Sequence, residues 1–90
     1  MTEARQTILV VDDDPEIIDL LKDHFNKRNC ETVATQDPST VIDKLRNISI
    51  KLMLLDLKMR KLDGFEVLDK IKAAGLKIPS TIIITGFLPK

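Results

Sequence analysis

The chain has 90 residues, enough for one hydrophobic core and one domain. Its 14 basic and 14 acidic residues cancel, and no run of lysine and arginine marks a face for nucleic acid or an anionic membrane, so direct nucleic-acid binding is not expected. The single Cys30 cannot form an internal disulfide and predicts a half-buried thiol in a reducing compartment, while the lack of a signal peptide or a long apolar run predicts a soluble, cytoplasmic protein.

The first element in the chain is a strand over residues 8–11, a continuous run rich in β-branched side chains that is typical of a strand buried on both faces. A helix follows, because Asp14 is a good N-cap residue and Pro15 suits the first helical position. Apolar residues then recur at helical spacing, at Ile17, Leu21 and Phe25. We therefore predict a strand and then a helix that begins at Pro15.

The next two elements are a more polar strand and a second helix. Residues 30–34 alternate polar and apolar side chains, as an edge strand does. A second Asp-Pro pair at 37–38 repeats the helix start signal. Apolar residues follow it at Val41, Ile42 and Leu45.

The last elements repeat the pattern of buried strand and helix. Residues 52–55 and 82–84 are apolar runs like the first strand, and each predicts a strand buried on both faces. The helix between them shows apolar residues at Phe65, Leu68 and Ile71 and ends before Gly75. Strands that alternate with helices indicate right-handed βαβ units in a doubly wound α/β sheet of the flavodoxin-like type, with strand order 2-1-3-4.

Acidic residues follow two of the buried strands directly. Asp12 and Asp13 follow the first strand, and Asp56 follows the third, which is its neighbour in this strand order. Adjacent strands lie about 4.8 Å apart, so Asp12 or Asp13 should converge on Asp56 at the carboxyl edge of the sheet. Carboxylates that converge repel one another unless a cation neutralises them, and an all-oxygen site suits Mg²⁺. Asp14 is explained by helix capping and is left out of this site.

These residues resemble the receiver domain of two-component response regulators. The resemblance lies in the strand that ends in paired acids (8–13), in the segment 54–59 with the turn 62–65, and in Thr85 after the last strand. It covers essentially the whole chain, 1–90.

The resemblance implies a phosphoacceptor domain. Asp56 would accept a phosphoryl group from a phosphohistidine on a sensor histidine kinase or a phosphotransfer protein. Asp13, Asp56 and the backbone carbonyl of Lys58 would bind Mg²⁺, and Asp12 would bond to metal-bound water. Thr85 would donate its hydroxyl to a phosphoryl oxygen.

The chain departs from the family pattern at two places. Arg60 stands where the family usually has proline, from which we expect a more mobile loop. The sequence ends at Lys90, before the family's usual fifth strand, lysine and fifth helix, so we expect a receiver that is incomplete at its C-terminus. The exposed edge of the fourth strand would then favour a homodimer.

Two other functions were weighed. A phosphohydrolase of the haloacid dehalogenase type needs a second acid two residues after its nucleophile, where Lys58 stands, so we expect a signalling domain and not an enzyme. A receiver-like interaction module that docks to a protein partner without being phosphorylated remains open on the sequence alone.

Overall fold

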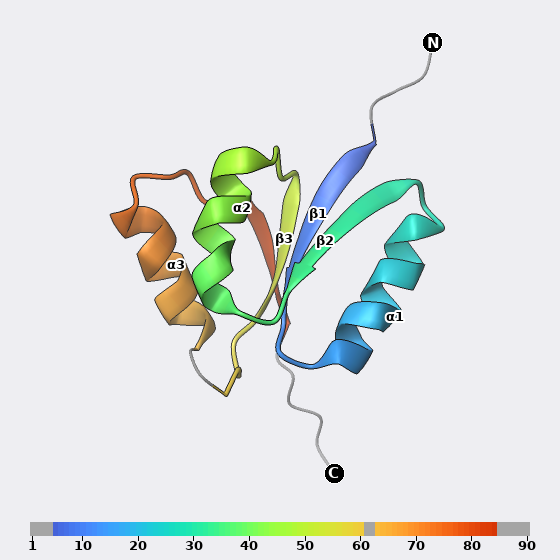
Figure 1. Ribbon diagram of the computed structural model, residues 1–90, viewed down its shortest axis with the longest axis horizontal. Coiled ribbons are helices and arrows are strands. Elements are labelled where there is room, and N and C mark those ends of the chain that lie inside the picture. The colour runs from blue at the N-terminus through green and yellow to red at the C-terminus, as the bar shows by residue number, and fades with distance from the viewer. Residues whose placement is uncertain (1–4, 61–62, 85–90) are drawn as a thin grey trace.

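The computed structural model describes residues 5–60 and 63–84, which form one parallel sheet with helices on both of its faces. In chain order the elements are β1 (Gln6–Val11), α1 (Pro15–Asn26), β2 (Cys30–Thr35), the 3₁₀ turn η1 (Pro38–Thr40), α2 (Val41–Asn47), β3 (Leu52–Asp56), α3 (Gly64–Ala73) and β4 (Ser80–Ile84). The strand order is β2-β1-β3-β4, and all three pairings are parallel. Helix α1 covers one face of the sheet, while α2 and α3 lie together on the other (Figure 1). The predicted doubly wound fold and strand order are confirmed.

The two faces of the central strands build two hydrophobic layers. Leu9 and Val11 of β1 point to the α2 and α3 side, whereas Ile8 and Val10 point to the α1 side, because side chains alternate along a strand. Strand β3 is buried in the same way on both sides. These two strands therefore fix the positions of whatever follows them at the carboxyl edge.

The outer strands differ from the central pair. Strand β2 is an edge strand with mostly half-buried residues, as predicted, and it begins at the half-buried Cys30. The last strand has the exposed edge that was expected for it, although its apolar pattern alone suits burial on both faces. Ile82 is 52% exposed and Ile83 is 43% exposed, because β4 forms the other edge of the sheet.

The helix ends follow the capping signals of the sequence. The Asp14 side chain accepts a hydrogen bond from the Glu16 N–H at 2.9 Å, so its role as the N-cap of α1 is confirmed. The second Asp-Pro pair opens η1, and the α-helix proper begins only at Val41. After α3, Gly75 adopts a positive φ of 75°, which ends the helix as expected.

The apolar stripe of α3 is shifted from the predicted one. Phe65 is 62% exposed, and the buried positions are Gly64, Val67 and Ile71. The three buried residues share one side of the helix, which faces the sheet, and Phe65 lies about 100° away from Gly64 around the axis. Of the three apolar residues that mark this helix in the sequence, Ile71 is buried and Leu68 packs against the core, whereas Phe65 faces solvent.

The start of α3 is pressed against the end of β3. A Cβ atom added to Gly64 would lie 2.6 Å from the Leu57 side chain and 2.9 Å from the Asp56 carbonyl oxygen. No side chain fits there without a shift of the backbone. Glycine at this position allows the helix to begin directly behind Asp56.

No helix in residues 5–60 and 63–84 is long and apolar enough to cross a membrane.

Candidate metal centre

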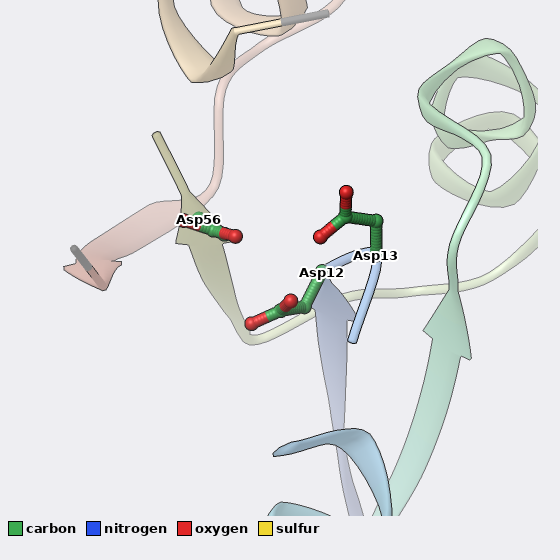
Figure 2. A group of neighbouring side chains, drawn as sticks. All are labelled: Asp12, Asp13 and Asp56. Carbon is green, nitrogen blue, oxygen red and sulfur yellow. The ribbon is translucent and has the colours of Figure 1, made fainter. Parts of the chain in front are cut away.

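Three carboxylates meet at the carboxyl edge of the two central strands. Val11 of β1 is in register with Leu55 of β3, so the residues that follow them lie side by side. Asp12, Asp13 and Asp56 each contribute an oxygen to a group in which these atoms lie within 4.8 Å of one another. Figure 2 shows the three side chains directed into one space from the ends of β1 and β3. The expected convergence of these acids is observed.

Burial of this group is uneven. Asp12 is 2% exposed and Asp56 is 3% exposed, whereas Asp13 is half-buried. The pKa of Asp12 is raised from the usual 3.8 to about 6, and burial is the largest cause of this shift. The Asp14 N–H, which bonds to Asp12 Oδ1 at 2.9 Å, lowers this pKa in part. The charges of Asp56 and Asp13 and a hydrogen bond with the Asp56 side chain raise it further. A cation placed among these oxygens would relieve the repulsion.

Backbone N–H groups orient the other two carboxylates. The Lys58 N–H donates to Asp56 Oδ1 at 2.9 Å, which fixes the end of β3 as a tight turn. The Arg60 N–H donates to Asp13 Oδ2, also at 2.9 Å, and so joins the loop after β3 to the loop after β1. Both carboxylates are thus held by main-chain groups before any ligand arrives.

The chemistry of this donor set fits a hard divalent cation. Its ligand atoms are carboxylate oxygens on a rigid sheet edge, and Mg²⁺ is commonly bound by one or two carboxylates with water filling the remaining positions. Asp13 is the most accessible of the three acids, so it lies on the solvent side of the group.

The remaining predicted site residues fall in two places. Lys58 lies in the turn after β3, where it also forms an isolated antiparallel bridge with Asp63. Thr85 lies outside the described residues. Asp14 caps α1, as expected, and its side chain is not part of the acidic group.

The main-chain group of Arg60 was missed as a part of this site. In the sequence, Arg60 stands out only as a departure from the proline that the family usually has there. Any residue other than proline brings a backbone N–H to this position, and this N–H could have been recognised as a possible donor to the acidic group.

A doubly wound parallel sheet with an acidic group at the carboxyl edge of its central strands defines a flavodoxin-like α/β domain with a candidate cation site. The family model of the response regulator receiver domain matches residues 8–88, and the chain belongs to this family. It is therefore a receiver domain of the two-component signalling class.

Individual relatives agree with this assignment. The chain is 30% identical over 80 residues to the heme response regulator HssR of Staphylococcus saprophyticus, with 89% of this chain and 35% of that protein covered. It is 32% identical over 66 residues to response regulator GtcR of Aneurinibacillus migulanus, with 73% of this chain and 27% of that protein covered. The match thus spans between about a quarter and about a third of the length of these two curated relatives.

Solved structures show the same fold. A response regulator receiver protein from Pseudomonas putida matches with a TM-score of 0.80 and 27% identity, over 98% of this chain and 74% of that chain. Response regulator protein TrrA from Thermotoga maritima, solved in complex with Mg²⁺-BeF, matches with a TM-score of 0.74 and 30% identity, over 91% of this chain and 70% of that chain.

Proposed function

We propose that this receiver domain accepts a phosphoryl group on Asp56, in a Mg²⁺-dependent reaction, from a sensor histidine kinase or a histidine phosphotransfer protein. The observation that supports this most is the position of Asp56. It ends a central strand, is buried, and lies within reach of two further carboxylates that can share a cation with it. The complex of TrrA with Mg²⁺-BeF is consistent with such a site.

The proposed reaction uses the carboxylate of Asp56 as a nucleophile. A carboxylate oxygen attacks the phosphorus, the P–N bond to the donor imidazole breaks, and the bonding pair leaves with the imidazole nitrogen. The Lys58 N–H on Oδ1 holds the carboxylate in one orientation during this attack. When Mg²⁺ is bound, it supplies positive charge against the oxygens of the transferred group.

The ligand set for Mg²⁺ is also a proposal. Asp13 and Asp56 would provide carboxylate oxygens. Lys58 would provide its backbone carbonyl, and Asp12 would accept a hydrogen bond from water held by the cation. Thr85 donates its hydroxyl to the phosphoryl group.

A small-molecule donor tests the proposed function directly. The protein is incubated with acetyl phosphate, with and without Mg²⁺, and its intact mass is measured. We expect a Mg²⁺-dependent gain in mass of one phosphoryl group. In a separate experiment, beryllofluoride with Mg²⁺ should shift the backbone amide signals in the NMR spectrum. A chain that responds to neither reagent is instead the non-phosphorylated interaction module.

Mg²⁺ binding without phosphate is expected to be weak, since the protein supplies few ligands and water supplies the rest. Asp13→Ala removes one of the carboxylate ligands, so we expect the dissociation constant for Mg²⁺ to rise by about tenfold or more. Isothermal titration calorimetry measures this change. Asp19→Ala, which removes an exposed acid from α1, is the matched control. Unchanged affinity in Asp13→Ala would show that the cation binds elsewhere.

The receiver family is a family of signalling domains. We propose that this chain turns over no external substrate and acts in the cytoplasm. It would act through protein partners, without direct contact to nucleic acid. We further propose that residues 1–90 act as one receiver unit.

Self-association through β4 is the last part of this proposal. The strand is a sheet edge with two exposed isoleucines, Ile82 and Ile83, and such an edge favours pairing with a second copy. We expect sedimentation velocity at micromolar concentration to show a dimer, and Ile83→Lys to shift it to monomer. Glu31→Lys, which places the same charge on the opposite edge strand, should remain dimeric. A cooperatively unfolding wild-type monomer at this concentration would contradict the proposal.

A further inference from the structure

The three acids of the metal centre receive their backbone hydrogen bonds in two different ways. Asp12 and Asp56 each accept an N–H from two residues further along the chain, so these two contacts form within a local turn. Asp13 accepts its N–H from Arg60, which is 47 residues away and belongs to the loop after β3. The orientation of Asp13 therefore depends on a second loop.

The geometry of this contact leaves one oxygen of Asp13 for a cation. The Arg60 N–H occupies Oδ2 at 2.9 Å, and no hydrogen bond to Oδ1 is found among the described residues. One Asp13 oxygen is directed toward Asp56 and the other is directed away from it (Figure 2). A carboxylate held at one oxygen cannot rotate freely, so it presents the other oxygen in a fixed direction.

Asp13 needs such a support more than its two neighbours do. Asp12 and Asp56 are buried, and packing limits their rotation, whereas Asp13 is half-buried and borders solvent. Fixing its rotamer in advance removes an entropy cost from cation binding.

We propose that the main-chain N–H of Arg60 is a positioning group for the divalent cation and acts by holding the Asp13 carboxylate toward Asp56. This inference rests on the proposed Mg²⁺ site. Because coupling is reciprocal, a cation bound at Asp13 also stabilises the loop after β3 through the same hydrogen bond. The role belongs to the backbone, so the identity of the side chain matters only in that proline lacks the N–H.

The test compares Arg60→Pro with Arg60→Ala. Both variants lose the guanidinium, but only Arg60→Pro loses the N–H, so the difference between them isolates the hydrogen bond. Mg²⁺ is titrated into each ¹⁵N-labelled protein, and the dissociation constant is taken from the amide shifts of Asp12 and Asp13. We expect Arg60→Pro to bind Mg²⁺ about tenfold more weakly than Arg60→Ala, in the range found when groups that orient metal ligands are removed. Equal affinities would overturn the proposal.

A second measurement stands even if Arg60→Pro fails to fold. In the wild-type protein, hydrogen exchange of the Arg60 amide should slow on addition of Mg²⁺ and should be faster in Asp13→Ala. An exchange rate that is the same in Asp13→Ala and wild type would overturn the role of Arg60.

Failure of the proposed Mg²⁺ site and failure of the role of Arg60 give different titration results. If Mg²⁺ shifts no amide of the wild-type protein, the proposed metal site is wrong and the role of Arg60 falls with it. If wild type binds Mg²⁺ but Arg60→Pro and Arg60→Ala bind it equally well, only the role of Arg60 is wrong.

Discussion

Asp56→Asn is expected to abolish labelling by acetyl phosphate in the presence of Mg²⁺. The asparagine amide is a poor nucleophile and cannot form an acyl phosphate, yet it has nearly the same shape as the carboxylate that it replaces. Its side-chain oxygen can still accept the Lys58 N–H, so the turn after β3 should survive. Intact-mass measurement after incubation with the donor gives the phosphorylated fraction, which should fall to background.

The control for this experiment is Asp19→Asn, which makes the same chemical change at an exposed position on α1. That variant should be labelled as fully as wild type. The folded state of Asp56→Asn is checked by its far-ultraviolet circular dichroism and by cooperative unfolding. Labelling that persists in folded Asp56→Asn would place the phosphoacceptor on another residue, and peptide mapping would then identify it.

The convergence of the three acids could be predicted from sequence because it follows from the sheet alone. Residues 8–11 and 52–55 are continuous apolar runs, which identify the two central strands, and Asp12 and Asp56 follow them directly. The carboxyl ends of adjacent parallel strands meet at one edge of the sheet. No long-range detail beyond strand order was needed.

Features that depend on contacts between distant loops or on the sheet edge could not be predicted in the same way. The bond from Arg60 to Asp13 joins segments 47 residues apart and requires the conformations of both loops. Exposure of Ile82 and Ile83 depends on what covers β4, whereas their β-branched pattern is the same as that of a buried strand. The apolar residues of α3 at 65, 67, 68 and 71 fit either of two neighbouring sides of the helix. The structure buries the side with Val67 and Ile71, so Phe65 is left exposed.

The free energy of unfolding should rise when the buried charge of Asp12 is removed. Its pKa is raised from 3.8 to about 6 in the folded protein, so the ionised carboxylate destabilises the folded state when no cation is bound. Each pKa unit corresponds to roughly 1.4 kcal/mol, so Asp12→Asn should stabilise the metal-free protein by about 2 to 3 kcal/mol at pH 7.5. The asparagine oxygen can still accept the Asp14 N–H.

The difference in free energy of unfolding between Asp12→Asn and wild type should depend on pH. As the pH falls from about 6 toward 4, the folded protein already holds a proton at Asp12 that the unfolded chain has not yet taken up, so this group adds stability to wild type over this range. The advantage of Asp12→Asn should therefore shrink toward zero near pH 4. Urea unfolding in EDTA at several pH values measures both curves. Asp14→Asn, which changes an exposed neighbour at which asparagine caps equally well, is the control variant.

Mg²⁺ should narrow the difference in stability between the two proteins. At the proposed site, the cation would bind the folded state and neutralise the carboxylates, so it would stabilise wild type by mass action, whereas Asp12→Asn has lost one charge of the site and would gain less. A stability gain that is the same at pH 4 and pH 7.5, with or without Mg²⁺, would mean that the substitution acts through packing. Ionisation of Asp12 would then not lower the free energy of unfolding. Repulsion among the carboxylates could in that case not be the reason for a cation to bind at this edge of the sheet.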